Sequence, residues 1–124
     1  MATPIDQEFF ARLRTLNDKF AAGVPDTLAR LHALGASFDP AAPQPELVAE
    51  LREVLHTIAG SAATFGYRAF GQQARVLEQN MRVLMTFETV PAADWRHWLE
   101  TLERFVARAT VNPKAEYTDS DSQQ

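Results

Sequence analysis

Apolar residues recur at spacings of three and four along most of this chain, which is the pattern of amphipathic α-helices. Stretches that alternate apolar and polar residues, as strands do, are nearly absent. The pattern predicts five helical segments, at residues 5–22, 25–35, 45–64, 67–87 and 91–110. Such helices, joined by short loops, favour an all-α fold: an antiparallel four-helix bundle (up-down-up-down) with an additional N-terminal helical segment.

One apolar stripe runs through both of the first two segments. Two interruptions, Gly23 and Pro25, fall in the middle of it. Proline is accepted at the first position of a helix but is costly in its interior. The sequence therefore leaves two interpretations open, a single kinked helix or two consecutive helices, the second ending at Gly35. The stripe consists of Ile5, Phe9, Leu13, Leu16, Phe20, Val24, Leu28 and Leu31.

The helical segments are expected to form one domain at residues 1–111. Residues 39–45 form a loop, because the three prolines within them cannot sustain a helix. Pro91 opens the last segment, and Asn112 and Pro113 end it. Residues 112–124 are polar and are expected to be a disordered tail.

Composition excludes several function classes. The 124 residues are 46% hydrophobic, which is typical of a globular domain, and no apolar run is long enough to span a membrane. A net charge of −4 with scattered basic residues argues against nucleic-acid binding. The absence of cysteine excludes disulfides and thiolate metal sites, and the N-terminus lacks the features of a signal peptide, so a cytoplasmic location is expected. A four-helix bundle is closed within one chain, which makes a monomer the simpler expectation.

Of the three histidines, only His56 stands in an unusual setting. Its ring falls about 150° from the centre of the apolar stripe of its segment and should therefore point to solvent. That stripe consists of Leu47, Leu51, Val54, Ile58, Ala62 and Phe65. The neighbouring residues on the outer face are Arg52, Ala59 and Gly60, one turn away, and Ala63, two turns away. Such a bare patch lets another protein approach closely, and a glycine inside a helix, which costs about 1 kcal/mol, calls for a reason of this kind. Neither His32 nor His97 stands in a motif typical of a metal site, so no metal site is expected.

A break near Tyr67 indicates that the third and fourth segments form an antiparallel hairpin. Counting outwards from Tyr67 places His56 level with Glu78, and Ala63 level with Gly71. A carboxylate at that level accepts a hydrogen bond from Nδ1–H of the ring, which fixes the tautomer and leaves Nε2 as an outward lone pair. Small residues that face each other allow the two helices to approach closely. An ordinary surface histidine and a solvated glutamate are the alternative interpretations.

The segment His56-Thr57-Ile58-Ala59-Gly60-Ser61-Ala62, followed by Phe65-Gly66 and later by Leu77-Glu78, resembles the signature of histidine-containing phosphotransfer (HPt) domains. The resemblance extends from about Phe9 to Ala109. It implies a phosphorelay intermediate of two-component signalling that accepts a phosphoryl group from a receiver-domain aspartate and passes it to another. It also implies phosphorylation of His56 on Nε2, orientation of the ring by Glu78, and receiver domains and a hybrid histidine kinase as partners. No cofactor and no autonomous catalysis are implied.

One position departs from the family pattern. The family commonly has lysine three residues after the histidine, where the cation stabilises the phosphoryl oxygens, and here that residue is Ala59. Arg75 lies level with residue 59 in the hairpin count, and Arg52 lies one turn before His56, so both are candidates to replace the lysine. The predicted docking surface consists of Ala59, Gly60, Ala63 and Gly71. Two rivals stay open: a degenerate docking module that binds a receiver or histidine kinase without carrying phosphate, and a purely structural bundle.

Overall fold

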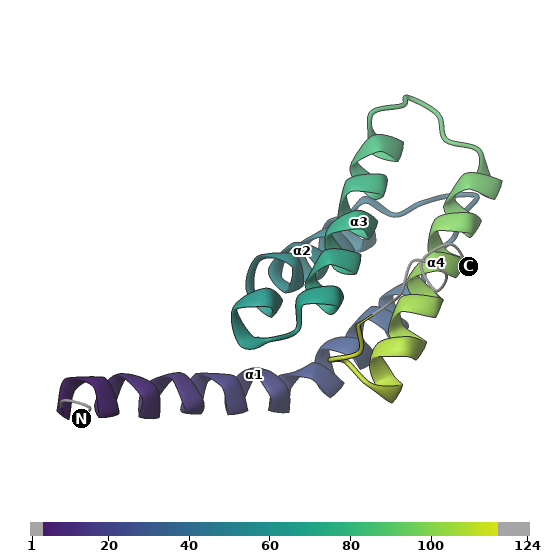
Figure 1. The fold of residues 1–124 in the computed structure, drawn as a ribbon. Helices are drawn as coiled ribbons and strands as arrows, with labels where there is room; N and C mark the ends of the chain where they lie inside the picture. The colour runs from purple at the N-terminus through teal and green to yellow at the C-terminus, as the bar shows by residue number, and fades with distance from the viewer. Residues whose placement is uncertain (1–3, 117–124) are drawn as a thin grey trace.

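A computed structural model describes residues 4–116, and the regular elements within that range are all helices. They are α1 (Pro4–Ala36), α2 (Pro45–Ser61), the short 3₁₀-helix η1 (Ala62–Phe65), α3 (Arg68–Met85) and α4 (Ala92–Val111). α2 packs against α3, α3 against α4, and α1 against both α2 and α4, so the four helices close a ring around one core (Figure 1). The predicted all-α helical bundle is confirmed.

Apolar side chains from all four helices form the core. The largest fully buried side chains are Leu31 of α1, Leu51 and Leu55 of α2, Met81 of α3 and Leu102 of α4. Each side chain of this size stabilises the folded state by about 1.5–3 kcal/mol when it is removed from water. The core therefore spans the whole cross-section of the bundle and holds each helix against two neighbours.

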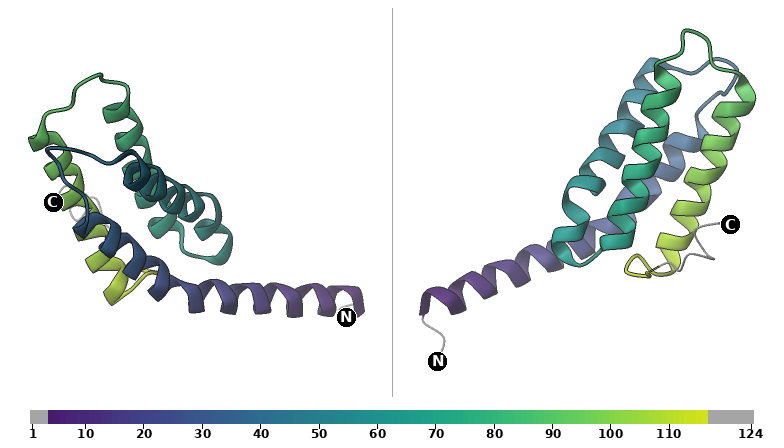
Figure 2. Two further views of the ribbon diagram at one scale, coloured as in Figure 1. Left: turned by 180° about the vertical axis from the view of Figure 1, so that it is seen from behind. Right: turned by 45° about the horizontal axis from the view of Figure 1, so that its top comes forward.

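α1 is one continuous helix of 33 residues with Pro25 inside it. The prediction of separate helices at 5–22 and 25–35 is therefore wrong, and the alternative of a single helix holds. The helix axis changes direction along its length (Figure 2), and a proline, which lacks a backbone donor, is a common cause of such a bend. The helix continues through Pro25 because Val24 and Leu28, on either side of it, are both buried in the bundle.

The other helices begin and end close to the predicted residues, with one change at the end of the predicted segment 45–64. There the last residues form η1 instead of α-helix. Gly66 follows with a φ of 88°, a left-handed conformation that glycine adopts without steric cost. Two backbone hydrogen bonds close this turn, from Gly66 N to Ala63 O at 3.1 Å and from Tyr67 N to Ala62 O at 2.9 Å. The turn reverses the chain and makes α2 and α3 antiparallel neighbours.

The residues after α4 lie against the end of the bundle. Nζ of Lys114 lies 5.1 Å from the centre of the Tyr67 ring, and Nη2 of Arg68 lies 3.6 Å from Oε2 of Glu116. These contacts place residues 112–116 against the bundle, and the disorder of the tail stays a prediction. The rest of the predicted tail, 117–124, lies outside the described residues. Within the described part of the chain, no helix combines the length and the hydrophobicity that a membrane span needs.

Candidate functional site

The His56 ring projects from α2 and is held by a carboxylate from α3. Nδ1 of His56 lies 2.8 Å from Oε2 of Glu78. The histidine side chain is 75% exposed, whereas the glutamate side chain is 8% exposed. A carboxylate accepts hydrogen bonds, so Nδ1 is the donor here, and in the neutral ring Nε2 then keeps its lone pair. No hydrogen bond reaches Nε2 from residues 4–116. The arrangement presents one ring nitrogen to solvent and fixes the other.

Glu78 is placed by the packing of α3. A buried carboxylate is costly unless it is hydrogen-bonded, and His56 supplies the bond. One residue earlier, the carbonyl of Leu77 accepts a hydrogen bond of 2.9 Å from Nε1 of Trp98 on α4. This bond is buried and ties α3 to α4 at the level of the pair. The acid is therefore held from two sides, by its partner on α2 and by the docking of α4.

Close contact between α2, η1 and α3 depends on Gly71. A Cβ placed on Gly71 would lie 3.1 Å from Cβ of Ala62 and 3.6 Å from the backbone nitrogen of Ala63. These distances leave little room for a larger residue. Gly60 differs, since a Cβ there would meet nothing within 4 Å. Gly71 therefore serves the approach of the helices, and Gly60 faces open space.

The predicted docking surface is exposed at only two of its four positions. Gly60 and Ala63 are exposed, whereas Ala59 and Gly71 are buried. The expected exposure of Ala59 is therefore wrong, and Gly71, which was expected both to dock a partner and to allow close helix approach, lies between the helices.

The reason is the rotation of α2 about its axis. Leu55, which is absent from the predicted apolar stripe, is fully buried, whereas Val54, which belongs to that stripe, is only partly buried. The buried face is thus turned by about 60° from the predicted one. This rotation buries Ala59 and leaves His56 at the edge of the buried face, within reach of Glu78.

Two arginines stand near the position where the family lysine is missing. Nη2 of Arg75 donates a hydrogen bond of 3.1 Å to the backbone carbonyl of Ala59. The Arg75 side chain is exposed, as is Arg52, one turn before His56 on α2. The structure therefore brings one cation of α3 into contact with residue 59, and places a second cation on the helix that carries the histidine.

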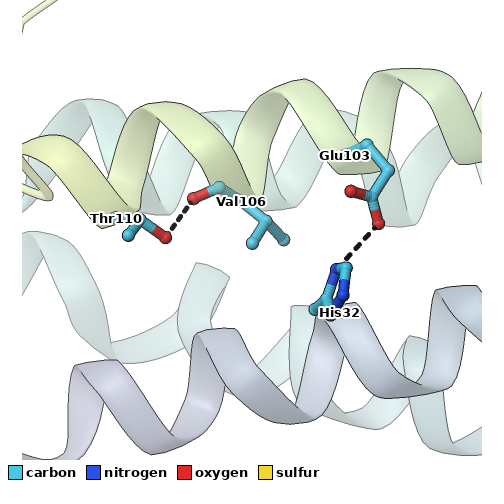
Figure 3. Close-up of polar contacts among 4 residues, drawn as sticks. All are labelled: His32, Glu103, Val106 and Thr110. Carbon is cyan, nitrogen blue, oxygen red and sulfur yellow. Dashed lines mark hydrogen bonds and ion pairs between the residues drawn. The ribbon is translucent and has the colours of Figure 1, made fainter.

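A second histidine–glutamate pair joins α1 to α4. Nδ1 of His32 lies 3.2 Å from Oε1 of Glu103, and the two residues are 71 positions apart in the sequence (Figure 3). No carboxylate stands near His32 in the sequence, so only the fold reveals the pair. Both residues line a cleft of about 690 Å³, where Oγ1 of Thr110 bonds back to the carbonyl of Val106 at 2.7 Å. Among the described residues, no group of three or more His, Cys, Asp or Glu side chains could hold a metal ion.

Both histidine–glutamate pairs lie in a part of the chain that matches a known protein family. The chain matches the family model of the Hpt domain over residues 7–109, a stretch that includes His56 and Glu78. Neither the curated proteins nor the solved structures gave a match. Domains of this family are phosphocarriers in two-component signalling, and they interact with receiver domains and histidine kinases. Because the match spans most of its length, this chain belongs to the Hpt domain family.

Proposed function

We propose that this protein is a phosphorelay intermediate. Nε2 of His56 accepts a phosphoryl group from a receiver-domain aspartate, and the group then passes to the aspartate of another receiver. The observation that carries the proposal is the exposed His56 ring, whose Nδ1 lies 2.8 Å from a buried carboxylate. A nucleophile that is oriented on one side and open on the other suits attack on a group held by a docked partner.

The transfer step balances without any cofactor. The Nε2 lone pair attacks the phosphorus of the aspartyl phosphate, and the bond between phosphorus and the aspartate oxygen breaks. The electron pair of that bond returns to the receiver as a free carboxylate. The proton on Nδ1 stays in place, hydrogen-bonded to Glu78. The reverse sequence of events delivers the group to the second receiver.

Glu78 stabilises the phosphorylated ring. With a proton on Nδ1 and a phosphoryl group on Nε2, the ring carries a positive charge. A negative carboxylate at hydrogen-bond distance favours that charge, and its 8% exposure limits screening by water. Glu78 is therefore assigned two tasks, the orientation of the free imidazole and the stabilisation of the charged one.

Arg75 is the proposed substitute for the family lysine, with Arg52 second. A guanidinium has five N–H donors, and the hydrogen bond to Ala59 uses one of them, so others remain for phosphoryl oxygens. Arg75→Ala is expected to shorten the lifetime of the phosphohistidine. Arg82→Ala, at an exposed position about two turns further along α3, is the matched control. Equal lifetimes in the two variants would remove Arg75 from the mechanism.

The receiver is proposed to dock over the exposed small residues beside His56, Gly60 and Ala63. Small side chains there allow the aspartyl phosphate to come within bonding distance of Nε2. Because transfer is reversible and the partner must leave, we expect the interface to be at the small end of the range for protein pairs. Receiver domains and a hybrid histidine kinase are the proposed partners.

The test is a transfer of label. The full chain is incubated with a receiver domain that carries a radiolabelled aspartyl phosphate. The label is expected to move to this protein, to be labile in acid and stable in base as phosphohistidine is, and to leave when a second, unlabelled receiver is added. A receiver that binds while its label stays in place would favour the rival docking module. The absence of the family lysine at Ala59 is the sequence feature that favours this rival. Absence of both binding and transfer would contradict the proposal and the rival alike.

A further inference from the structure

The N-terminal half of α1 extends beyond the bundle with an apolar face that nothing in the described structure covers. We call residues 4–19 the arm, and Figure 1 and Figure 2 show it projecting away from the other helices. None of the described side chains of the arm is buried, and the first buried residue of α1 is Val24. Phe9, Phe10 and Leu16 are 47%, 60% and 52% exposed.

The exposed face of the arm continues the face by which the rest of α1 enters the core. The Phe20 ring lies 5.0 Å from the Phe65 ring, and Val24 and Leu28, one and two turns further on, are buried. Leu16 lies one turn before Phe20 on the same face. The bundle covers this face in one half of the helix and leaves it bare in the other. The arm is continuous with the packed half of α1, which supplies its helical nucleus, but its apolar face stays in water until a partner covers it.

We propose that the partner is the arm of a second copy of this chain, packed antiparallel. The face residues Phe9, Leu13, Leu16 and Phe20 are separated by four, three and four positions, an order that reads the same in both directions. An antiparallel helix with the same sequence therefore matches Leu13 with Leu16 of the second copy, and it sets Phe9 against Phe20, which the bundle buries only in part. The two-fold symmetry repeats each match, as a self-complementary interface requires.

The charges of the arm fit a second copy better than a strongly charged partner. Residues 4–19 contain three acidic and three basic residues, so their net charge is 3 − 3 = 0, whereas the whole chain carries −4. Two arms therefore meet without net repulsion, and the net negative charge resides on the rest of each chain. The six residues are Asp6, Glu8, Asp18, Arg12, Arg14 and Lys19.

The dimer is expected to be weak. A half-exposed large side chain offers on the order of 100 Å² for burial, so Phe9 and Leu16, the two face residues that are about half exposed, offer about 200 Å² per copy. A standard protein interface buries about 800 Å² per partner. The expectation of a monomer rested on the bundle being closed within one chain, and that reason does not extend to the arm. Dimerisation through the arm does not depend on phosphotransfer at His56.

The first test measures the mass of the full chain in solution by sedimentation and light scattering, from low micromolar to several hundred micromolar. The mass is expected to rise toward that of a dimer with concentration. The variant Phe9→Glu/Leu16→Glu should raise the dissociation constant by at least about tenfold, with an unchanged melting temperature because both residues are exposed. Val83→Glu is the control, since Val83 is an equally exposed apolar residue, 56%, on α3. Label transfer to His56 serves as a check that the arm variant remains folded.

The second test fixes the register. The chain has no cysteine, so Leu13→Cys and Leu16→Cys are clean single-thiol variants. In the antiparallel register a mixture of the two forms an intermolecular disulfide faster than either variant alone, because the Cβ atoms then come within bonding range. A parallel pair would instead favour each variant linking to itself, which overturns the proposal.

Two further results would overturn it. One is a monomer at every concentration. The other is association that the double arm variant and the Val83 control change equally. If the wild type is monomeric and the arm variant loses receiver binding, the arm belongs to the receiver interface and the second copy is excluded.

Discussion

The chain carries two histidine–glutamate pairs that are alike in their atoms and different in their burial. In both, Nδ1 of an exposed histidine faces a carboxylate oxygen from a neighbouring helix, at 2.8 Å for His56–Glu78 and 3.2 Å for His32–Glu103. The Glu78 side chain is 8% exposed, whereas that of Glu103 is 51% exposed. Water screens an exposed pair, whose contribution to stability is about 0–1 kcal/mol. Burial of the acid, and not the existence of the pair, is what holds an imidazole in one orientation.

The surroundings of the two histidines differ as well. His56 stands beside the exposed small residues Gly60 and Ala63, whereas His32 lines a cleft between α1 and α4. The family match covers both pairs, so membership alone does not choose between them. The motif around His56 and the burial of Glu78 favour His56–Glu78 as the functional pair.

The largest expected difference in label transfer is between the variants of the two histidines. His56→Gln should reduce transferred label to background, because glutamine offers no ring nitrogen to phosphorylate. His32→Gln should transfer as much label as the wild type. Both variants are assayed with the same phosphorylated receiver, and their far-UV circular dichroism confirms the fold. Label that survives in His56→Gln and disappears in His32→Gln would reverse the assignment.

The transfer rates of variants of the two glutamates should differ by a smaller factor. Glu78→Gln keeps the shape of the side chain and removes the charge that favours the phosphorylated ring. A hydrogen bond to a charged group contributes about 1.5–3 kcal/mol, which corresponds to a roughly 10- to 100-fold slower transfer. Glu103→Gln should leave the rate unchanged, because its exposed pair is screened. Rapid-quench kinetics measures both. An equal loss in the two variants would show that burial does not separate the pairs.

Bulk added beside the two histidines should also act differently. Gly60→Leu places a side chain in open space, where even a Cβ would meet nothing within 4 Å, so the melting temperature should not fall. It should nevertheless slow transfer from a receiver by about tenfold or more, by keeping the two proteins apart. Ala29→Leu, at an exposed position one turn before His32, should leave the rate of transfer from the receiver unchanged. If Gly60→Leu transfers like the wild type, the docking surface lies elsewhere.

The smallest expected effects are those of alanine at Gly71, which lies between the helices, and at Gly60, which faces open space. Gly71→Ala introduces a Cβ 3.1 Å from that of Ala62 and should lower the free energy of unfolding by about 1 kcal/mol. Gly60→Ala meets no neighbour and should raise it by about 0.5–1 kcal/mol through helix propensity. Urea denaturation measures both changes. A Gly71→Ala variant as stable as Gly60→Ala would mean that α2 and α3 tolerate a wider separation.

Local pattern was sufficient to predict most of the fold and part of the site. The hairpin count about Tyr67 placed His56 level with Glu78, and the two lie 2.8 Å apart in the structure. The count works because a short turn fixes the register of two antiparallel helices. The same count placed Arg75 level with Ala59, whose carbonyl it contacts at 3.1 Å.

What the sequence did not predict depends on neighbours that are distant along the chain. The rotation of α2 is set by its packing on the rest of the bundle, so Leu55 was missed as a core residue and Ala59 was assigned to the surface. His32 and Glu103 are 71 positions apart, and no local pattern signals their contact. Pro25 indicated a helix end, but tertiary packing on both sides of it outweighed the cost of one hydrogen bond.

The short turn at Gly66 also bears on the order in which the molecule assembles. His56 and Glu78 are 22 positions apart on one hairpin, so little chain entropy is lost when they meet, and contacts of this kind form early in refolding. The Trp98–Leu77 bond spans 21 positions between the consecutive helices α3 and α4, so chain entropy alone does not separate the two contacts. During synthesis, however, both residues of the reactive pair emerge before α4 does, so a nascent chain is able to form the pair first.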